Sequence, residues 1–164
     1  MTGYADFEEF VLARRGALLR TAYLLTGNPH DAEDLVQAAL IKVVPKWTRI
    51  QDRPEAYVRA VLARESTNRW RGRRWREVST DTVPEVMHHN SADRTDQIAL
   101  LEDLRKLSPR QRAVLVLRYF DDLTEADTAA ALGISVGTVK SHAHNGLARL
   151  RNQQPDEEQS RATT

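Results

Sequence analysis

The stretch that decides the fold is T-E-A-D-T-A-A-A-L-G-I-S-V-G-T-V-K-S-H, which runs from Thr124 to His142. Its first residues are a capping-box signature, which predicts a short helix that ends at Leu132. Glycine readily adopts the left-handed backbone conformation that often follows a helix, so Gly133 is expected to end this one. Serine is favoured at the N-cap position, so Ser135 is expected to begin the next helix. Two capped helices separated by a three-residue turn predict a helix-turn-helix.

The second helix of this unit has one apolar face, because Val139, Ala143, Leu147 and Leu150 recur at helical spacing. The second helix of a helix-turn-helix enters the major groove of DNA. Small, hydrogen-bonding and cationic side chains suit base edges and phosphates. The residues predicted to contact DNA are therefore the polar ones outside the apolar face: Thr138, Lys140, Ser141, His144 and Asn145.

The amino-terminal half of the chain also has helical periodicity. Residues 7–25 predict a first helix, which the G-N-P segment at 27–29 stops. Asp31 is expected to cap a second helix, which Pro45 should kink or end. A third helix is expected over about residues 54–75. No strand pattern is visible, so the fold class is predicted to be all-α.

The predicted third helix has a basic end. Seven arginines lie between Arg59 and Arg76, Glu65 is the only acid among them, and Trp70 and Trp75 are interleaved. Arginines neutralise phosphates, and aromatic rings stack on exposed bases. The segment therefore predicts contact with unpaired or melting DNA. The alternative is a solvated basic helix end with inward tryptophans.

Composition limits the function classes. The 164 residues include no cysteine, which excludes disulfides and thiolate metal sites. No apolar run is long enough for a membrane span and no signal peptide is visible, so a cytoplasmic location is expected. Residues 1–75 carry 13 basic and 9 acidic side chains, whereas residues 76–94 carry 2 and 4. Two neutral-to-basic blocks are thus separated by an acidic, polar stretch.

Four stretches together resemble the extracytoplasmic-function (ECF) sigma factors of RNA polymerase, and most closely the actinobacterial SigE family. These stretches are Asp31–Gln37, Glu55–Leu62, Leu107–Tyr119 and Gly133–His142. The resemblance covers about residues 5–151 and implies two small helical domains joined by a flexible linker. The implied parts are sigma region 2 (5–76), a linker (77–95), the sigma region 4 helix-turn-helix (96–152) and a disordered tail (153–164).

The resemblance also implies partners and site residues. Core RNA polymerase would be contacted through its β′ clamp helices and β flap, with Asp31, Asp34, Leu35 and Gln37 as the docking residues. The −10 promoter element and strand opening would involve Arg59, Arg69, Trp70, Arg71, Arg73 and Arg74. The −35 element would be read by the recognition-helix residues given above. An anti-sigma factor is a possible partner, and neither a catalytic residue, a metal nor a cofactor is expected.

The chain departs from the family pattern at three places. Many relatives have V-N-T where this chain has Ala63, Arg64 and Glu65, so the base pocket of the family is not carried over. Asn145 and Gly146 replace an arginine and an alanine that relatives often have. Gly146 is expected to cost the helix up to about 1 kcal/mol relative to alanine. Ala38 also replaces an acidic or hydroxyl residue.

Two other functions fit part of the sequence. An autonomous, dimeric helix-turn-helix regulator would explain residues 95–151 but not the basic helix or the Asp31–Gln37 stretch. The segment at 133–137 also matches G-x-S-x-G, the nucleophile elbow of α/β-hydrolases. That elbow requires a preceding strand, and the preceding residues here are helix formers.

Overall fold

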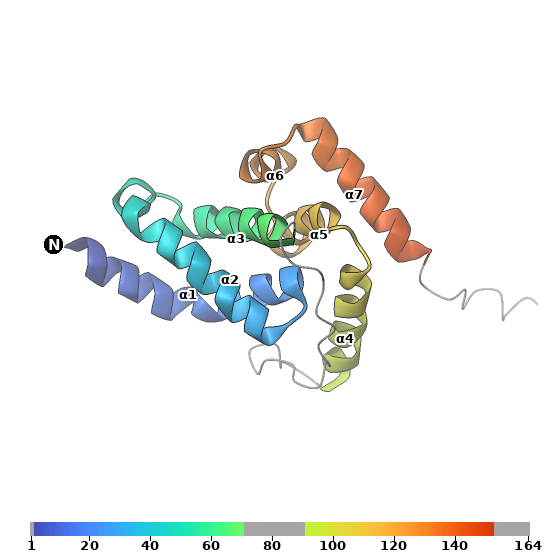
Figure 1. Ribbon diagram of the computed structural model, residues 1–164, viewed down its shortest axis with the longest axis horizontal. Helices are drawn as coiled ribbons and strands as arrows, with labels where there is room; N and C mark the ends of the chain where they lie inside the picture. The colour runs from blue at the N-terminus through green and yellow to red at the C-terminus, as the bar shows by residue number, and fades with distance from the viewer. Residues whose placement is uncertain (1, 71–90, 153–164) are drawn as a thin grey trace, which may run out of the picture.

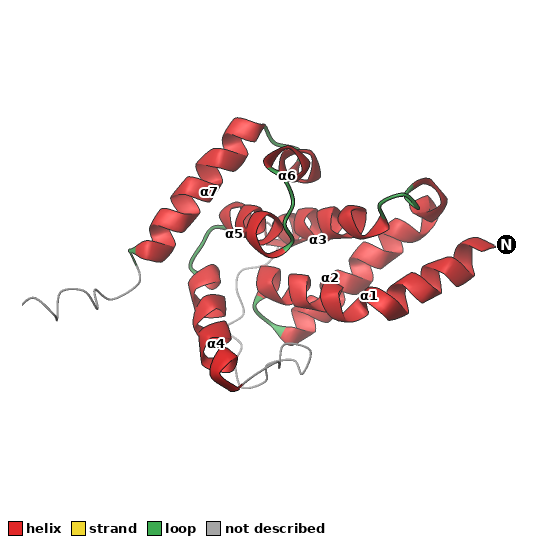
Figure 2. Cartoon of the chain, turned by 180° about the vertical axis from the view of Figure 1, so that it is seen from behind, coloured by secondary structure: helices red, strands yellow, loops and turns green. Residues whose placement is uncertain are grey.

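The computed structural model describes residues 2–70 and 91–152, which form helices joined by short turns (Figures 1 and 2). No strand occurs among these residues, which confirms the all-α class. The elements are α1 (Thr2–Thr26), α2 (Pro29–Val43), the 3₁₀ helix η1 (Val44–Arg49), α3 (Pro54–Trp70), α4 (Ser91–Arg105), α5 (Pro109–Leu115), the π-helical turn η3 (Val116–Phe120), α6 (Glu125–Leu132) and α7 (Val136–Arg151).

The turn between α1 and α2 uses Asn28 as its cap. The Asn28 side-chain oxygen accepts from the backbone N–H of His30 at 2.8 Å and of Asp31 at 3.2 Å. The prediction that Asp31 is the N-cap was therefore wrong, because Asn28 is extended and Pro29 already occupies the first helical position. At the other end, α2 stops at Val43 and the chain continues as η1, as Pro45 predicts.

An aromatic cluster joins the amino-terminal part of α1 to η1, which follows α2. The ring of Trp47 lies 5.3 Å from that of Phe7 and 5.1 Å from that of Phe10. Both phenylalanines belong to the first turns of α1, so η1 folds back over the start of the chain. Helix α3 packs against α1 and α2, and its Val58 and Leu62 are fully buried.

The capping predictions for the carboxy-terminal helices are confirmed. Ser108 forms both bonds of a capping box with Gln111. The side chain of Thr124 accepts from the backbone of α6, that of Ser135 accepts from the backbone of α7, and Gly133 is left-handed with φ +66°. The π-helical turn η3 was not predicted.

Helix α4 begins at Ser91, within the stretch 77–95 that was predicted to be a linker. Residues 71–90 and 153–164 lie outside the described structure, and with them most of that linker, the tail and the end of the predicted third helix. The predicted domain boundaries therefore remain predictions.

The amino-terminal and carboxy-terminal helices share one core. Leu18, Leu35 and Leu62 belong to the same buried cluster as Leu104 and Leu117. Figure 1 shows α5 at the centre of the molecule, beside α3 and next to the end of α4. The helix-turn-helix adds a small core of its own, formed by Val114, Ala129 and Val139. The sequence predicted each set of helices but not their packing against each other.

A buried arginine lies where these helices meet. Arg112 of α5 is 4% exposed. Its guanidinium donates to four backbone carbonyl oxygens: those of Leu25 at 3.0 Å, Leu104 at 2.8 Å, Leu107 at 3.1 Å and Arg105 at 3.3 Å. Burial, with a smaller effect of the neighbouring Arg105 charge, lowers the Arg112 pKa to about 10. The side chain therefore stays charged at neutral pH and bonds the carboxy-terminal ends of α1 and α4 to α5.

We expect Arg112→Met to lower the free energy of unfolding by about 3–5 kcal/mol, because several buried carbonyl groups lose a charged donor. Arg110→Met is the matched control, since Arg110 is exposed on the same helix. Urea unfolding followed by circular dichroism measures both variants. Equal midpoints for the two would contradict this role of Arg112.

Candidate nucleic-acid interface

Helix α7 presents the predicted recognition residues to solvent. Lys140, Ser141, His144 and Asn145 are exposed, whereas Val139 is fully buried. The orientation inferred from the apolar spacing is therefore confirmed, although whether these side chains contact DNA remains a prediction. Ala143, Leu147 and Leu150 are half-buried on the opposite side.

Thr138 lies at the start of the same helix and is half-buried. Its backbone N–H donates to the Oγ of Ser135 at 3.1 Å, and the two hydroxyl groups are 2.8 Å apart. Capping thus fixes the first turn of α7, where free backbone N–H groups and the helix dipole favour an anion such as phosphate.

Glu125 of α6 forms one ion pair with the recognition helix and one with η3. The Nζ of Lys140 lies 3.7 Å from a carboxylate oxygen of Glu125, whose other oxygen lies 3.9 Å from Arg118. Exposed pairs of this kind contribute little to stability, so Lys140 can exchange Glu125 for another anion. The neighbouring His142 is half-buried, and burial together with the Arg110 charge lowers its pKa.

The close approach of α7 to α5 explains Gly146. This glycine is buried, and a Cβ there would lie 3.0 Å from Cδ1 of Leu115, which is itself 2% exposed. The expectation that glycine weakens α7 relative to alanine considered helix propensity alone. Contact with α5 adds a packing cost to alanine at this position, which that expectation did not include.

The basic residues of α3 are less available than the sequence predicted. Arg59 is half-buried and paired with Glu55 at 2.7 Å and with Asp121 at 3.7 Å. Arg69 is half-buried, and its guanidinium is 3.5 Å from the backbone oxygen of Asp34. Trp70 is the last described residue of α3, and Arg71, Arg73 and Arg74 lie outside the described residues.

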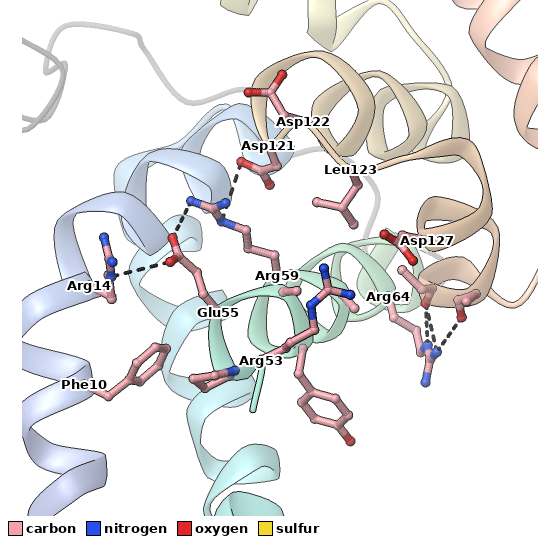
Figure 3. Close-up of a pocket in the computed structure, with 16 residues that line it drawn as sticks. Phe10, Arg14, Arg53, Glu55, Arg59, Arg64, Asp121, Asp122, Leu123 and Asp127 are labelled. Atoms are coloured by element: carbon pink, nitrogen blue, oxygen red, sulfur yellow. Dashed lines mark hydrogen bonds and ion pairs between the residues drawn. The ribbon is translucent and has the colours of Figure 1, made fainter. Parts of the chain in front are cut away.

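A groove of about 750 Å³ separates α3 from the segment that connects η3 to α6 (Figure 3). Arg59 and Arg64 reach into it from α3, and Asp121 and Leu123 from the other side. Asp121 accepts from the Thr21 hydroxyl at 3.0 Å and lies opposite Arg59. Burial nevertheless raises the Asp121 pKa, against the lowering effect of Arg59 and Thr21. The contacts with Arg59 and Thr21 thus only partly offset the cost of burying the Asp121 carboxylate.

The predicted polymerase-docking residues divide into two groups. Asp34 and Gln37 are exposed on α2, and Asp31 is half-buried on the same helix. Leu35 is completely buried in the core of the chain itself. Its assignment as a docking residue is corrected: it supports the helix from within, because the apolar side of α2 faces α1 and α3.

Sequence reasoning missed Arg64 and Asp121 as contact residues between the two halves. Arg64 was noted only as a departure from the family pattern, and Asp121 only as part of a turn. Their side-chain hydrogen bonds join residues that are 66 to 100 positions apart along the chain. No local spacing could have indicated such pairs.

Two further observations concern the described residues alone. They contain no group of three or more His, Asp or Glu side chains that could hold a metal ion. None of their helices is long and apolar enough to cross a lipid bilayer.

Comparison with known proteins shows which family of proteins the chain resembles in sequence. Residues 10–76 match the family model described as Sigma-70 region 2, and residues 97–150 match the one described as Sigma-70, region 4. The RNA polymerase sigma-E factor of Streptomyces avermitilis is 44% identical over 151 residues, which cover 90% of this chain and 84% of that protein. The ECF RNA polymerase sigma factor SigL of Mycobacterium tuberculosis is 34% identical over 82% of this chain and 80% of its own length.

The chain therefore belongs to the ECF family of RNA polymerase sigma factors. The match to region 2 accounts for the amino-terminal helices that an autonomous helix-turn-helix regulator would leave unexplained. The absence of a strand before residues 133–137, in the part of the chain that the structure describes, removes the basis for a nucleophile elbow.

Two solved structures are similar to the whole fold. The sigma factor RpoE in complex with the anti-sigma factor NepR, from Bartonella quintana, has a TM-score of 0.65 and 26% identity, covering 90% of this chain and 95% of that one. CnrH in complex with the cytosolic domain of CnrY has a TM-score of 0.64 and 22% identity, covering 91% of this chain and 87% of that one. The second similarity concerns the fold alone.

We expect Gly146→Ala to lower the free energy of unfolding by about 1 kcal/mol, because overpacking against Leu115 outweighs the gain in helix propensity. Gly137→Ala is the control, since a Cβ there meets only Ser135 Oγ at 3.8 Å. It should leave stability unchanged or raise it by up to about 1 kcal/mol. Thermal melts measure both, and a stabilised Gly146→Ala variant would contradict the packing argument.

Proposed function

We propose that this sigma factor binds core RNA polymerase and directs it to specific promoters, with region 4 reading the −35 element and region 2 acting at the −10 element. The observation that carries this proposal is the exposed polar face of α7, defined by Lys140, Ser141, His144 and Asn145. These side chains follow the helix start that Ser135 caps, and side chains on the outward face of a recognition helix are the ones that reach base edges in the major groove.

The proposed polymerase contact is the exposed side of α2. Asp34 and Gln37 are one helical turn apart and both exposed, so one partner surface can reach both. The β′ clamp helices are the proposed partner for this face, and the β flap is the proposed partner for region 4. Tethering both regions to one polymerase raises the effective concentration of each at the promoter, so neither needs to bind DNA tightly alone.

An anti-sigma factor is a further proposed partner. The similar sigma factor RpoE, which shares 26% identity with this chain, was solved in complex with the anti-sigma factor NepR. A protein that holds the two sigma regions together would keep them from a promoter.

We also propose that the chain has no catalytic activity of its own and acts in the cytoplasm. The polymerase would catalyse phosphodiester bond formation, and the sigma factor would only bind the polymerase and position it on the promoter. Its membership of the sigma family supports this assignment.

Asp34→Arg with Gln37→Arg should weaken association with core polymerase by at least about tenfold, because like charge and lost hydrogen bonds at the centre of an interface each cost more than about 1 kcal/mol. Circular dichroism should show unchanged helix content. The pair Glu9→Arg and Gln51→Arg changes the charge equally at other exposed positions and should bind as the wild type does. Wild-type affinity in the α2 variant would refute the docking assignment.

Lys140→Ala should weaken promoter binding by the polymerase–sigma complex. If Lys140 contacts a base, the loss is about 1–3 kcal/mol and preference relaxes at one position. If it contacts a phosphate, binding falls for all sequences and the salt slope drops by about one. Lys106→Ala is the control, because Lys106 is also exposed but lies in the turn that follows α4. Unchanged binding by Lys140→Ala at several salt concentrations would contradict the assigned face.

A further inference from the structure

Asn145 carries an exposed carboxamide in the interior of α7. Its amide makes no hydrogen bond with any other group of the residues that the structure describes. Asparagine is also less favourable within a helix than alanine, leucine or lysine, because its short polar side chain competes for backbone groups. The residue therefore weakens the helix slightly and stabilises nothing inside the chain. A side chain of this kind is better explained by a contact with a partner.

The outward face of α7 is narrow around Asn145. Ser141 lies one turn before it and Ala148 nearly one turn after it, and both side chains are small. Figures 1 and 2 show α7 at the edge of the molecule, with the other helices on one side of it. A helix with small side chains on its outward face can come close to the floor of a major groove. The short side chain of Asn145 could then reach a base edge.

Longer cationic side chains leave the same helix on its flanks. Lys140 and Arg149 are both exposed and lie nine residues apart, which is about two and a half helical turns. They therefore extend from opposite sides of the outward face, where the phosphates that border a groove would lie. Lys140 is already 3.7 Å from an anionic group, the carboxylate of Glu125. The base edges are thus left to the residues between the flanks, and Asn145 is the one carboxamide within α7.

The hydrogen-bonding pattern of a carboxamide matches one base. The oxygen accepts and the nitrogen donates, in one plane. Adenine presents the complementary pair in the major groove, an N6 amino donor beside the N7 acceptor, whereas guanine presents two acceptors. Lysine favours guanine and serine bonds several bases, so neither Lys140 nor Ser141 supplies the same selectivity.

We propose that Asn145 reads an adenine of the −35 element by accepting from its N6 amino group and donating to its N7. The inference rests on the proposed function, which places α7 at the −35 element. Promoters of this sigma factor then carry an A·T base pair at the position that Asn145 faces. An amide bears no charge, so loss of this contact changes sequence preference and leaves the salt dependence of binding as it was.

Selection from a library of promoters tests the assignment. The DNA has random bases at the −35 and −10 elements, and it is bound by core polymerase that carries this sigma factor. The wild type should enrich adenine at one −35 position at least about fivefold, the lower end of discrimination by a bidentate contact. Asn145→Ala should lose the enrichment at that position alone. Asn152→Ala is the matched control, because it removes the same exposed amide from the C-cap of α7 and should keep the wild-type preference.

Two further measurements distinguish a base contact from a structural role. Asn145→Arg should move the preference at the same position from adenine to guanine, because arginine donates to both guanine acceptors. 7-Deazaadenine lacks the N7 acceptor, so at that position it should weaken binding of the wild type about fivefold and leave binding of Asn145→Ala unchanged. Thermal melts should show Asn145→Ala at least as stable as the wild type, since alanine is the better helix former.

The outcomes separate this inference from the proposed function. An enriched −35 sequence that Asn145→Ala keeps in full would overturn the inference and leave the proposed function intact. A position that depends on Asn145 but does not prefer adenine would overturn it as well. Equal binding of adenine and 7-deazaadenine by the wild type would overturn the N7 contact. If the wild type enriches no −35 sequence at all, the proposed function itself fails.

Discussion

The guanidinium group of Arg112 determines how the helices of this sigma factor are joined. It is buried at the centre of the molecule and donates to carbonyl groups at the ends of α1 and α4. A buried charge is tolerated only where hydrogen bonds replace its lost hydration. Each of these helices must therefore end close to Arg112, and α5, which carries it, becomes the central helix. Arg112 thereby bonds the end of a region 2 helix to two helices of region 4, beside the apolar core that the regions share.

Arginines at helix carboxy-termini recur across the contact between the two regions. Arg105 donates to the oxygen of Gly27 after α1, Arg112 donates to Leu25, and Arg64 donates to Ala131 at the end of α6. The last turn of every helix leaves carbonyl groups unpaired, and a planar group with five donors can bond several of them. The chain has 20 arginines and only 4 lysines. Some of these arginines therefore serve packing between regions and are unavailable to nucleic acid in this conformation.

The two proposed DNA-binding surfaces differ in how many of their side chains already bond other parts of the chain. The polar face of α7 is exposed because the opposite side of that helix packs against α5, including the close contact at Gly146. The basic side of α3 is partly occupied because Arg59 and Arg64 bond groups of region 4. Binding of DNA by α7 would displace only the exposed ion pair between Lys140 and Glu125, whereas engagement of α3 would compete with contacts between the two regions.

The sequence by itself determined the helices, their caps and the outward face of α7. The side chains of Ser108, Thr124 and Ser135 bond backbone groups within three residues, so their roles can be inferred from spacing. Tertiary structure decided the rest. Leu35 was assigned to a partner but lies in the core, and Arg64 bonds a carbonyl group 67 residues away. Such contacts depend on how whole helices pack, and that packing depends on many weak interactions that no local pattern records.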